Sequence, residues 1–178
     1  MGISQSLLPE FDHEMGTTRT VLLRVPDGRF DWKPHDKSSA MGGLATHVAN
    51  IPTWAVSAIT LNELDLAPGG QPVAPLQPAA TNEALMKTFD ENVKKAREAI
   101  AGASDETLFK PWSLLHGGNT ILTLPRIAVL RSFVLSHLIH HRGQLSVYLR
   151  LNDIPVPSIY GPSADEGGFM DQTKTAGT

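Results

Sequence analysis

The chain has 178 residues, of which 41% are hydrophobic, and its formal net charge at pH 7 is −3. This length and composition predict one globular domain with a buried core, spanning residues 1–178 and ending in a loose tail from about residue 165. The near-balanced charge excludes a basic nucleic-acid-binding surface, and no apolar run is long enough to span a membrane, so we expect a cytoplasmic protein. Because the chain has no cysteine, disulfides, thiolate metal ligands and a cysteine nucleophile are excluded.

Two helices are predicted in the first third of the chain, because apolar residues recur there at intervals of three and four. The first pattern consists of Leu8, Phe11, Met15, Thr18, Leu22 and Val25. The second consists of Leu44, His47, Ile51, Trp54, Ala58 and Leu61. Ser6 is expected to cap the first helix, and Ser38 or Ser39 the second. Pro52 should bend the second helix, since proline cannot donate a hydrogen bond to the carbonyl of Val48.

The middle of the chain predicts a long crossover followed by a third helix. Residues 65–80 hold four prolines and two glycines, so they are expected to form an irregular connection inside one domain. Thr81 should cap the third helix, which ends at Gly102. Its inward residues are expected to be Leu85, Phe89, Val93, Ala96 and Ile100.

The remaining part predicts a short insert and a fourth helix. Between residues 107 and 124, two apolar runs flank the turn residues 116–119, a pattern typical of a short hairpin or an extended insert. Pro125 suits the first turn of the last helix, which should end near Leu151. The fold class expected from these elements is all-α, a four-helix bundle with a long crossover and a short insert before the last helix.

Three histidines lie on the inward faces of two predicted helices. His137 and His141 are four residues apart, so they project from the same face of the last helix one turn apart. His47 occupies an inward position on the second helix. A buried imidazole nitrogen needs a hydrogen-bond or metal partner, and one shared metal ion would serve all three. The alternative is three unrelated core histidines, each bonded to a carbonyl or a carboxylate.

The proposed ligand set indicates a particular class of metal site. Three neutral imidazoles leave a coordination position open, as in catalytic rather than structural sites, and an all-nitrogen set suits Zn, Ni, Fe or Cu. Leu138 follows His137, so the glutamate of an HExxH metalloprotease is missing. His140, His13 and His35 are interpreted as surface residues, with a supporting role for His140 as the alternative.

Five further residues near these helices carry weaker expectations. Arg142 is expected to form a salt bridge that fixes the last helix to a neighbour. Gly143 should permit a close approach between helices. Gln144 is either a support for a metal ligand or a structural residue. Trp54 and Trp112 are expected in the core rather than in a substrate site.

These residues resemble the DinB/YfiT-like superfamily of bacterial proteins. LATHVANIPTW, which contains His47, is similar to the segment of that family with the first metal ligand. HLIHHRGQL, which contains His137 and His141, is similar to its H-x-x-x-H-R-G-Q signature. The likeness covers nearly the whole chain, including PVPSIYGPSADE. It implies a helical bundle of unusual connectivity, a divalent metal on these three histidines, and a homodimer.

The resemblance also implies a range of functions. Similar proteins include S-transferases and isomerases that use low-molecular-weight thiols, and proteins described as metal-dependent hydrolases. We therefore expect a divalent transition metal, Zn or Ni first, and a hydrolase or a low-molecular-weight-thiol S-transferase acting on a small-molecule substrate. Neither nucleic acid nor a membrane is expected as a partner, and catalytic residues are not assigned. The alternative is a non-enzymatic metal-binding stress-response protein.

Overall fold

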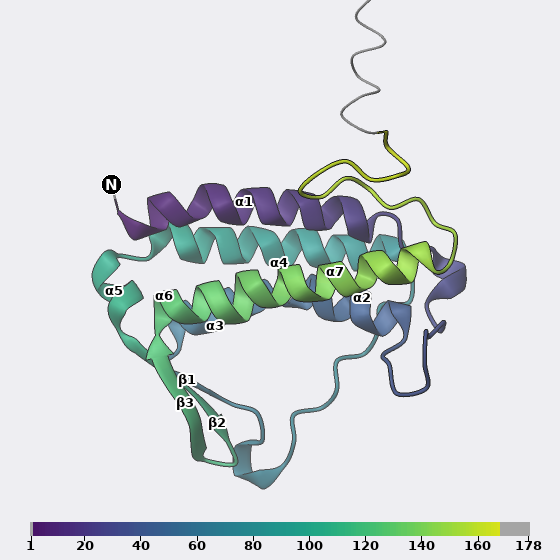
Figure 1. Cartoon of the computed structure of the whole chain (residues 1–178). Helices are drawn as coiled ribbons and strands as arrows, with labels where there is room; N and C mark the ends of the chain where they lie inside the picture. The colour runs from purple at the N-terminus through teal and green to yellow at the C-terminus, as the bar shows by residue number, and fades with distance from the viewer. Residues whose placement is uncertain (1, 168–178) are drawn as a thin grey trace, which may run out of the picture.

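Four helical segments packed side by side form the body of the molecule (Figure 1). They are α1 (Ile3–Leu22), the successive helices α2 (Met41–Asn50) and α3 (Thr53–Thr60), α4 (Asn82–Gly102), and a continuous last segment of α6 (Arg126–Val129), the π-helical η3 (Leu130–Ser136) and α7 (His137–Arg150). The computed structural model describes residues 2–167, so most of the predicted loose tail lies outside the described residues. Within 2–167, no helix combines the length and the hydropathy needed to cross a bilayer.

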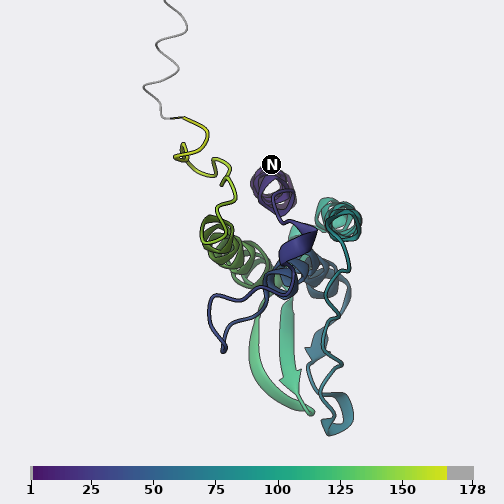
Figure 2. The ribbon, with the colours of Figure 1, turned by 90° about the vertical axis from the view of Figure 1, so that its right-hand side faces the viewer.

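The core lies between these helices and consists largely of the inward residues that the spacing predicts. Phe11 of α1, Ala58 of α3 and Phe89 of α4 lie on the predicted inward faces and are fully buried. Val48 of α2 and Leu138 of α7, which the spacing did not place inward, are fully buried as well. Helix α4 packs against α1, α2 and α3, and the end-on view shows the four segments surrounding this core (Figure 2). Each such Phe, Val or Leu side chain contributes about 1.5–3 kcal/mol through its removal from water.

The predicted bend at Pro52 and the predicted cap of the third helix are confirmed. Pro52 divides the second helix, since α2 ends at Asn50 and α3 begins at Thr53. The hydroxyl of Thr81 accepts the backbone N–H of Ala84 at 3.2 Å, as expected of an N-cap residue.

The predicted caps of the first two helices are wrong. Gly2 and Ala40 occupy the N-cap positions of α1 and α2, and neither makes a side-chain hydrogen bond to its helix. Ser6 lies inside α1, where its hydroxyl donates to the carbonyl of Ile3 at 2.8 Å.

A small sheet beside the bundle corrects the all-α expectation. It has three strands in the order β1 (Glu63–Asp65), β2 (Pro111–His116) and β3 (Asn119–Pro125). The antiparallel pair β2–β3 confirms the predicted hairpin, whereas β1 comes from the crossover and pairs in parallel with β2. A short helix, α5 (Asp105–Phe109), precedes the hairpin and was not predicted. The sheet extends away from the α3 and α6 end of the bundle (Figure 1).

Two polar side chains hold the sheet and the last helix in place. The carboxylate of Asp65 accepts the backbone N–H groups of Ala67, Gly117 and Gly118 at 2.8–2.9 Å, which ties the crossover to the hairpin turn. Both turn glycines have positive φ values, 60° and 78°, as a tight hairpin turn requires.

Buried Arg126 donates to carbonyls at the end of α3, including those of Ala58 and Ile59 at 2.7–2.8 Å, and so joins α6 to α3.

Candidate metal centre

The structure brings together the three histidines predicted as ligands. His47 lies in the last turn of α2, His137 begins α7, and His141 lies one turn further along α7. The Nε2 atom of His137 is 3.4 Å from Nε2 of His47 and 2.7 Å from Nε2 of His141. One ring nitrogen from each histidine lies within 4.8 Å of the other two. The inward faces of α2 and α7 therefore meet at this histidine cluster.

This arrangement fits a divalent ion after a small adjustment. Zn–N bonds of 2.0–2.1 Å in a tetrahedral site separate two nitrogen ligands by about 3.3 Å. The distance between His47 and His137 matches this value, whereas His137 and His141 need to move apart by about 0.6 Å. Among residues 2–167, no fourth His, Asp or Glu joins the cluster. The histidines thus leave one coordination position free.

Partial burial favours the neutral form of two of these imidazoles, His47 and His137. The pKa of His47 is lowered to about 4, mainly because burial removes its ring from water. Charge repulsion from His141, and then from His137, lowers this pKa further. Desolvation, and then His141, also lowers the pKa of His137. A neutral imidazole has a free lone pair on one nitrogen, which is the state that binds a metal.

Gln144 determines which nitrogen of His141 carries its hydrogen. Its amide nitrogen is 3.1 Å from Nε2 of His140, and its amide oxygen is 2.7 Å from Nδ1 of His141. The oxygen accepts a hydrogen bond from Nδ1–H, which leaves the Nε2 lone pair of His141 directed at the other two rings. Of the two interpretations of Gln144, the structure supports the first, a support for a ligand. His140 lies outside the cluster, and His13 and His35 are exposed.

The sequence profile of the DinB family matches residues 1–174. The chain belongs to the DinB family. Among solved structures, a DinB-like protein from Bacillus cereus ATCC 10987 is similar with a TM-score of 0.68 and 17% identity, covering 88% of this chain and 97% of that one. A DinB-like protein (YjoA) from Bacillus subtilis has a TM-score of 0.62 and 18% identity, with 84% and 95% covered. No curated protein matches the sequence. The expected homodimer and cytoplasmic location stay predictions.

The last helix of this DinB protein has a π-helical segment directly before its metal-ligand candidates. The N–H of His137 bonds to the carbonyl of Ser132, five residues back, instead of the usual four. Val129, Phe133 and His137 follow one another at intervals of four along this stretch, and all three line the same cavity. The regular spacing of the sequence predicted a simple α-helix here.

Arg142, next to His141, forms the predicted salt bridge, with α1 as the neighbour. Its Nη2 atom is 2.8 Å from Oε2 of Glu14, and both side chains are buried. The hydroxyl of Tyr160 donates to the same carboxylate and accepts from Arg142 at 2.7 Å, which attaches the segment after α7. The expectation for Gly143 is wrong, because this residue is exposed and a Cβ there would meet no atom within 4 Å.

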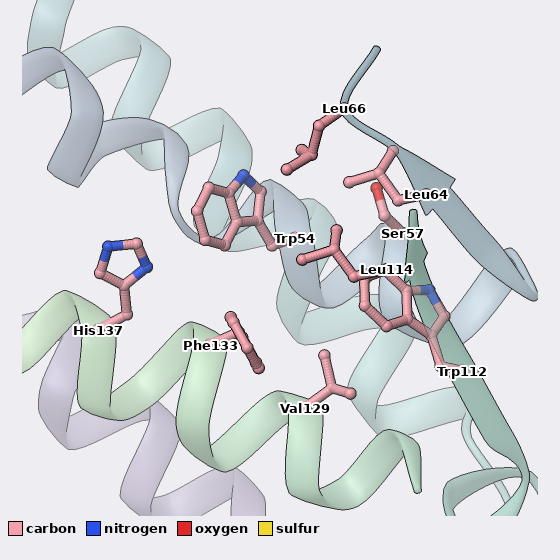
Figure 3. Close-up of a pocket in the computed structure, with 9 residues that line it drawn as sticks. All are labelled: Trp54, Ser57, Leu64, Leu66, Trp112, Leu114, Val129, Phe133 and His137. Carbon is pink, nitrogen blue, oxygen red and sulfur yellow. The ribbon is translucent and has the colours of Figure 1, made fainter. Parts of the chain in front are cut away.

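A cavity of about 220 Å³ lies beside the histidines of this DinB protein (Figure 3). Its helical walls are formed by Trp54, Ser57, Val129, Phe133 and His137. Its other walls are formed by Leu64, Trp112 and Leu114 of the sheet and by Leu66, which directly follows β1. The indole ring of Trp54, which lines the cavity, has its centroid 5.0 Å from the ring centroid of His137 and 5.9 Å from that of His47. Trp112 is buried as expected, but both tryptophans also line this cavity, which corrects their assignment to the core alone.

Proposed function

We propose that this DinB protein is a metal-dependent enzyme whose divalent ion is held by His47, His137 and His141. The observation that carries the proposal is the convergence of three imidazole nitrogens, with no fourth His, Asp or Glu at the cluster among residues 2–167, beside a cavity of small-molecule size. A structural zinc site is closed by a fourth protein ligand, whereas a catalytic one keeps a position for substrate or water. The free position therefore favours an enzyme over a non-enzymatic metal-binding stress-response protein.

A divalent ion there, Zn or Ni in the first instance, would supply a Lewis acid that lowers the pKa of a water or thiol nucleophile. The protein's own side chains would then hold and orient the reactants. The described residues that form the cavity walls include no carboxylate, so they offer no acidic residue as a general base. Ser57 supplies a hydroxyl in the wall, and the apolar surfaces exclude water. This fits a nucleophile that is activated by an ion.

The two chemistries that we propose are hydrolysis and S-transfer from a low-molecular-weight thiol, with a small molecule as substrate. The chain has no cysteine, so a thiol nucleophile would have to be a separate molecule. The assay compares the metal-loaded protein on aryl esters in water with the same protein on an aryl halide plus cysteine or glutathione. Turnover of esters alone would identify a hydrolase, and thiol-dependent loss of halide a transferase. Turnover of neither across a broad substrate panel would overturn the enzymatic proposal.

The metal site itself has a direct test. The protein is purified without a histidine tag, incubated with Zn²⁺ or Ni²⁺ and desalted, and the bound metal is measured by mass spectrometry. We expect one ion per chain in the wild type and loss of that ion in His47→Ala and His137→Ala. His13→Ala, which removes an exposed histidine of α1, is the control and should keep the ion. Equal retention in all variants would refute the assignment.

A further inference from the structure

We infer that the substrate of this DinB protein carries an apolar group the size of a substituted phenyl ring, bound in the cavity beside His137 while its reacting end lies at the three histidines. This inference rests on the proposed function, since it concerns the same site. It names a substrate class that the family membership alone does not supply.

The walls of the cavity select for an apolar group. Leucine, valine and aromatic side chains form nearly all of the lining, and within residues 2–167 no Lys, Arg, Asp or Glu belongs to it. A phosphate, carboxylate or ammonium group placed there would lose its hydration without gaining a partner, which is strongly unfavourable. Among the lining residues that the structure describes, Ser57 alone supplies a hydroxyl. The body of the substrate is therefore uncharged and carries few polar groups.

The volume sets the size of this group. An apolar protein cavity of about 150 Å³ is sufficient to bind benzene. The space beside His137 is about 220 Å³, so it accommodates a phenyl ring with a small substituent or a branched alkyl chain of similar bulk.

The shape of the cavity relates this group to the reacting end. His137 lies at one end and Trp112 at the other, with Leu114 between Trp54 and Trp112 (Figure 3). His137 belongs both to the lining and to the histidine cluster. A molecule with its reacting group at the histidines would thus extend its apolar part past Trp54 and Phe133 toward Trp112.

The sheet supplies the wall that faces the bundle. Leu64 of β1 pairs in register with Leu114 of β2, so these two neighbours present adjacent side chains to the cavity. Leu66 follows β1, is held by a 2.9 Å hydrogen bond from its N–H to the carbonyl of Leu115, and is 43% exposed. An exposed leucine at the edge of an apolar cavity loses its contact with water when a ligand enters. The crossover and the hairpin therefore determine specificity, while the bundle holds the histidines.

The test uses two probes that share a metal-binding group and differ in their apolar part. Acetohydroxamate carries a methyl group and benzohydroxamate a phenyl ring. We expect the Zn²⁺-loaded wild type to bind benzohydroxamate about tenfold or more tightly than acetohydroxamate in calorimetry, because the ring is removed from water. Leu114→Trp, which fills the cavity, and Leu66→Asp, which places a charge at its edge, should abolish this preference while leaving acetohydroxamate binding unchanged.

Matched controls separate cavity effects from general damage. Ile121→Trp changes an exposed position of β3, and Leu76→Asp an exposed leucine of the crossover, and neither residue lines the cavity. Both controls should keep the preference for benzohydroxamate. Equal binding of the two probes by the wild type, or a preference that persists in Leu114→Trp and Leu66→Asp, would overturn the inference and leave the metal site standing. Absence of bound Zn²⁺ from the wild type would instead overturn the proposed function, and the inference with it.

Discussion

At the scale of single residues, the orientation of His141 depends on the amide of Gln144. The amide oxygen lies 2.7 Å from Nδ1, on the opposite side of the ring from the Nε2 atom that faces His137. Hydrogen bonds of this kind hold a metal-binding imidazole in the correct tautomer, and their loss commonly weakens metal binding by about 10–100-fold. Gln144 is itself exposed, so its replacement should not disturb the core.

We therefore expect Gln144→Leu to weaken Zn²⁺ binding by about 10–100-fold, because Nδ1–H loses its acceptor. Gln144→Glu keeps an acceptor oxygen at the same position and should bind Zn²⁺ nearly as the wild type does. Competition with a chromophoric chelator measures both affinities, and thermal melting of the metal-free proteins checks that their folds are equally stable. Unchanged affinity in Gln144→Leu would show that the ring is held by packing alone.

At the scale of helices and strands, Asp65 connects the crossover to the hairpin. The pKa of this carboxyl group is lowered, first by the hydrogen bond from the N–H of Ala67 and further by those from Gly118 and Gly117. Desolvation acts in the opposite direction but is outweighed. The folded protein thus binds a proton at Asp65 less readily than the unfolded chain does. The contribution of Asp65 is present above the pKa of the unfolded carboxyl, about 3.9, and is lost as the pH falls through its lower folded pKa.

This linkage predicts that the hairpin turn opens more easily in acid. Amide hydrogen exchange at Gly117 and Gly118, corrected for intrinsic rates, should show protection that decreases as the pH falls below about 4 in the wild type. Asp65→Asn should have reduced protection at every pH and no such titration. Amides in the middle of α4 serve as the reference, and the same acid response in Asp65→Asn would contradict the role of this carboxylate.

The elements of this fold differ in how much of them the sequence could predict. The stripes of α1 and α4 and the positions of His47, His137 and His141 follow from local spacing, because each helix buries one face. Strand β1 has three residues, and its partner β2 lies some 50 residues further along, so no local pattern marks it. The π-helical segment is a shift of main-chain hydrogen bonds without a residue signature. The cavity was missed because α3, the sheet and the last helix form it jointly.

At the scale of the whole molecule, a buried ion pair joins the helix of the metal site to the first helix. Arg142 of α7 and Glu14 of α1 are both buried, and Tyr160 attaches the segment after α7 to the same pair. Two charges removed from water are stable only when they are paired and hydrogen-bonded. Arg142 meets this condition, because it also donates to the carbonyl of Glu14 and the hydroxyl of Thr18 at 3.1–3.2 Å.

We expect Glu14→Ala to reduce the free energy of unfolding by about 3–5 kcal/mol, because it leaves the Arg142 charge buried without its partner. The double replacement Glu14→Leu with Arg142→Met removes both charges and should recover most of this loss. Urea denaturation of the metal-free proteins measures the stability of both variants and of the wild type. The exposed pair of Asp12 and Arg97, which joins α1 to α4 at 2.8 Å, is the control, and Asp12→Ala should cost no more than about 1 kcal/mol. A double variant as unstable as Glu14→Ala would mean that the specific polar contacts of this pair, rather than the penalty of an unpaired charge, hold α7 against α1.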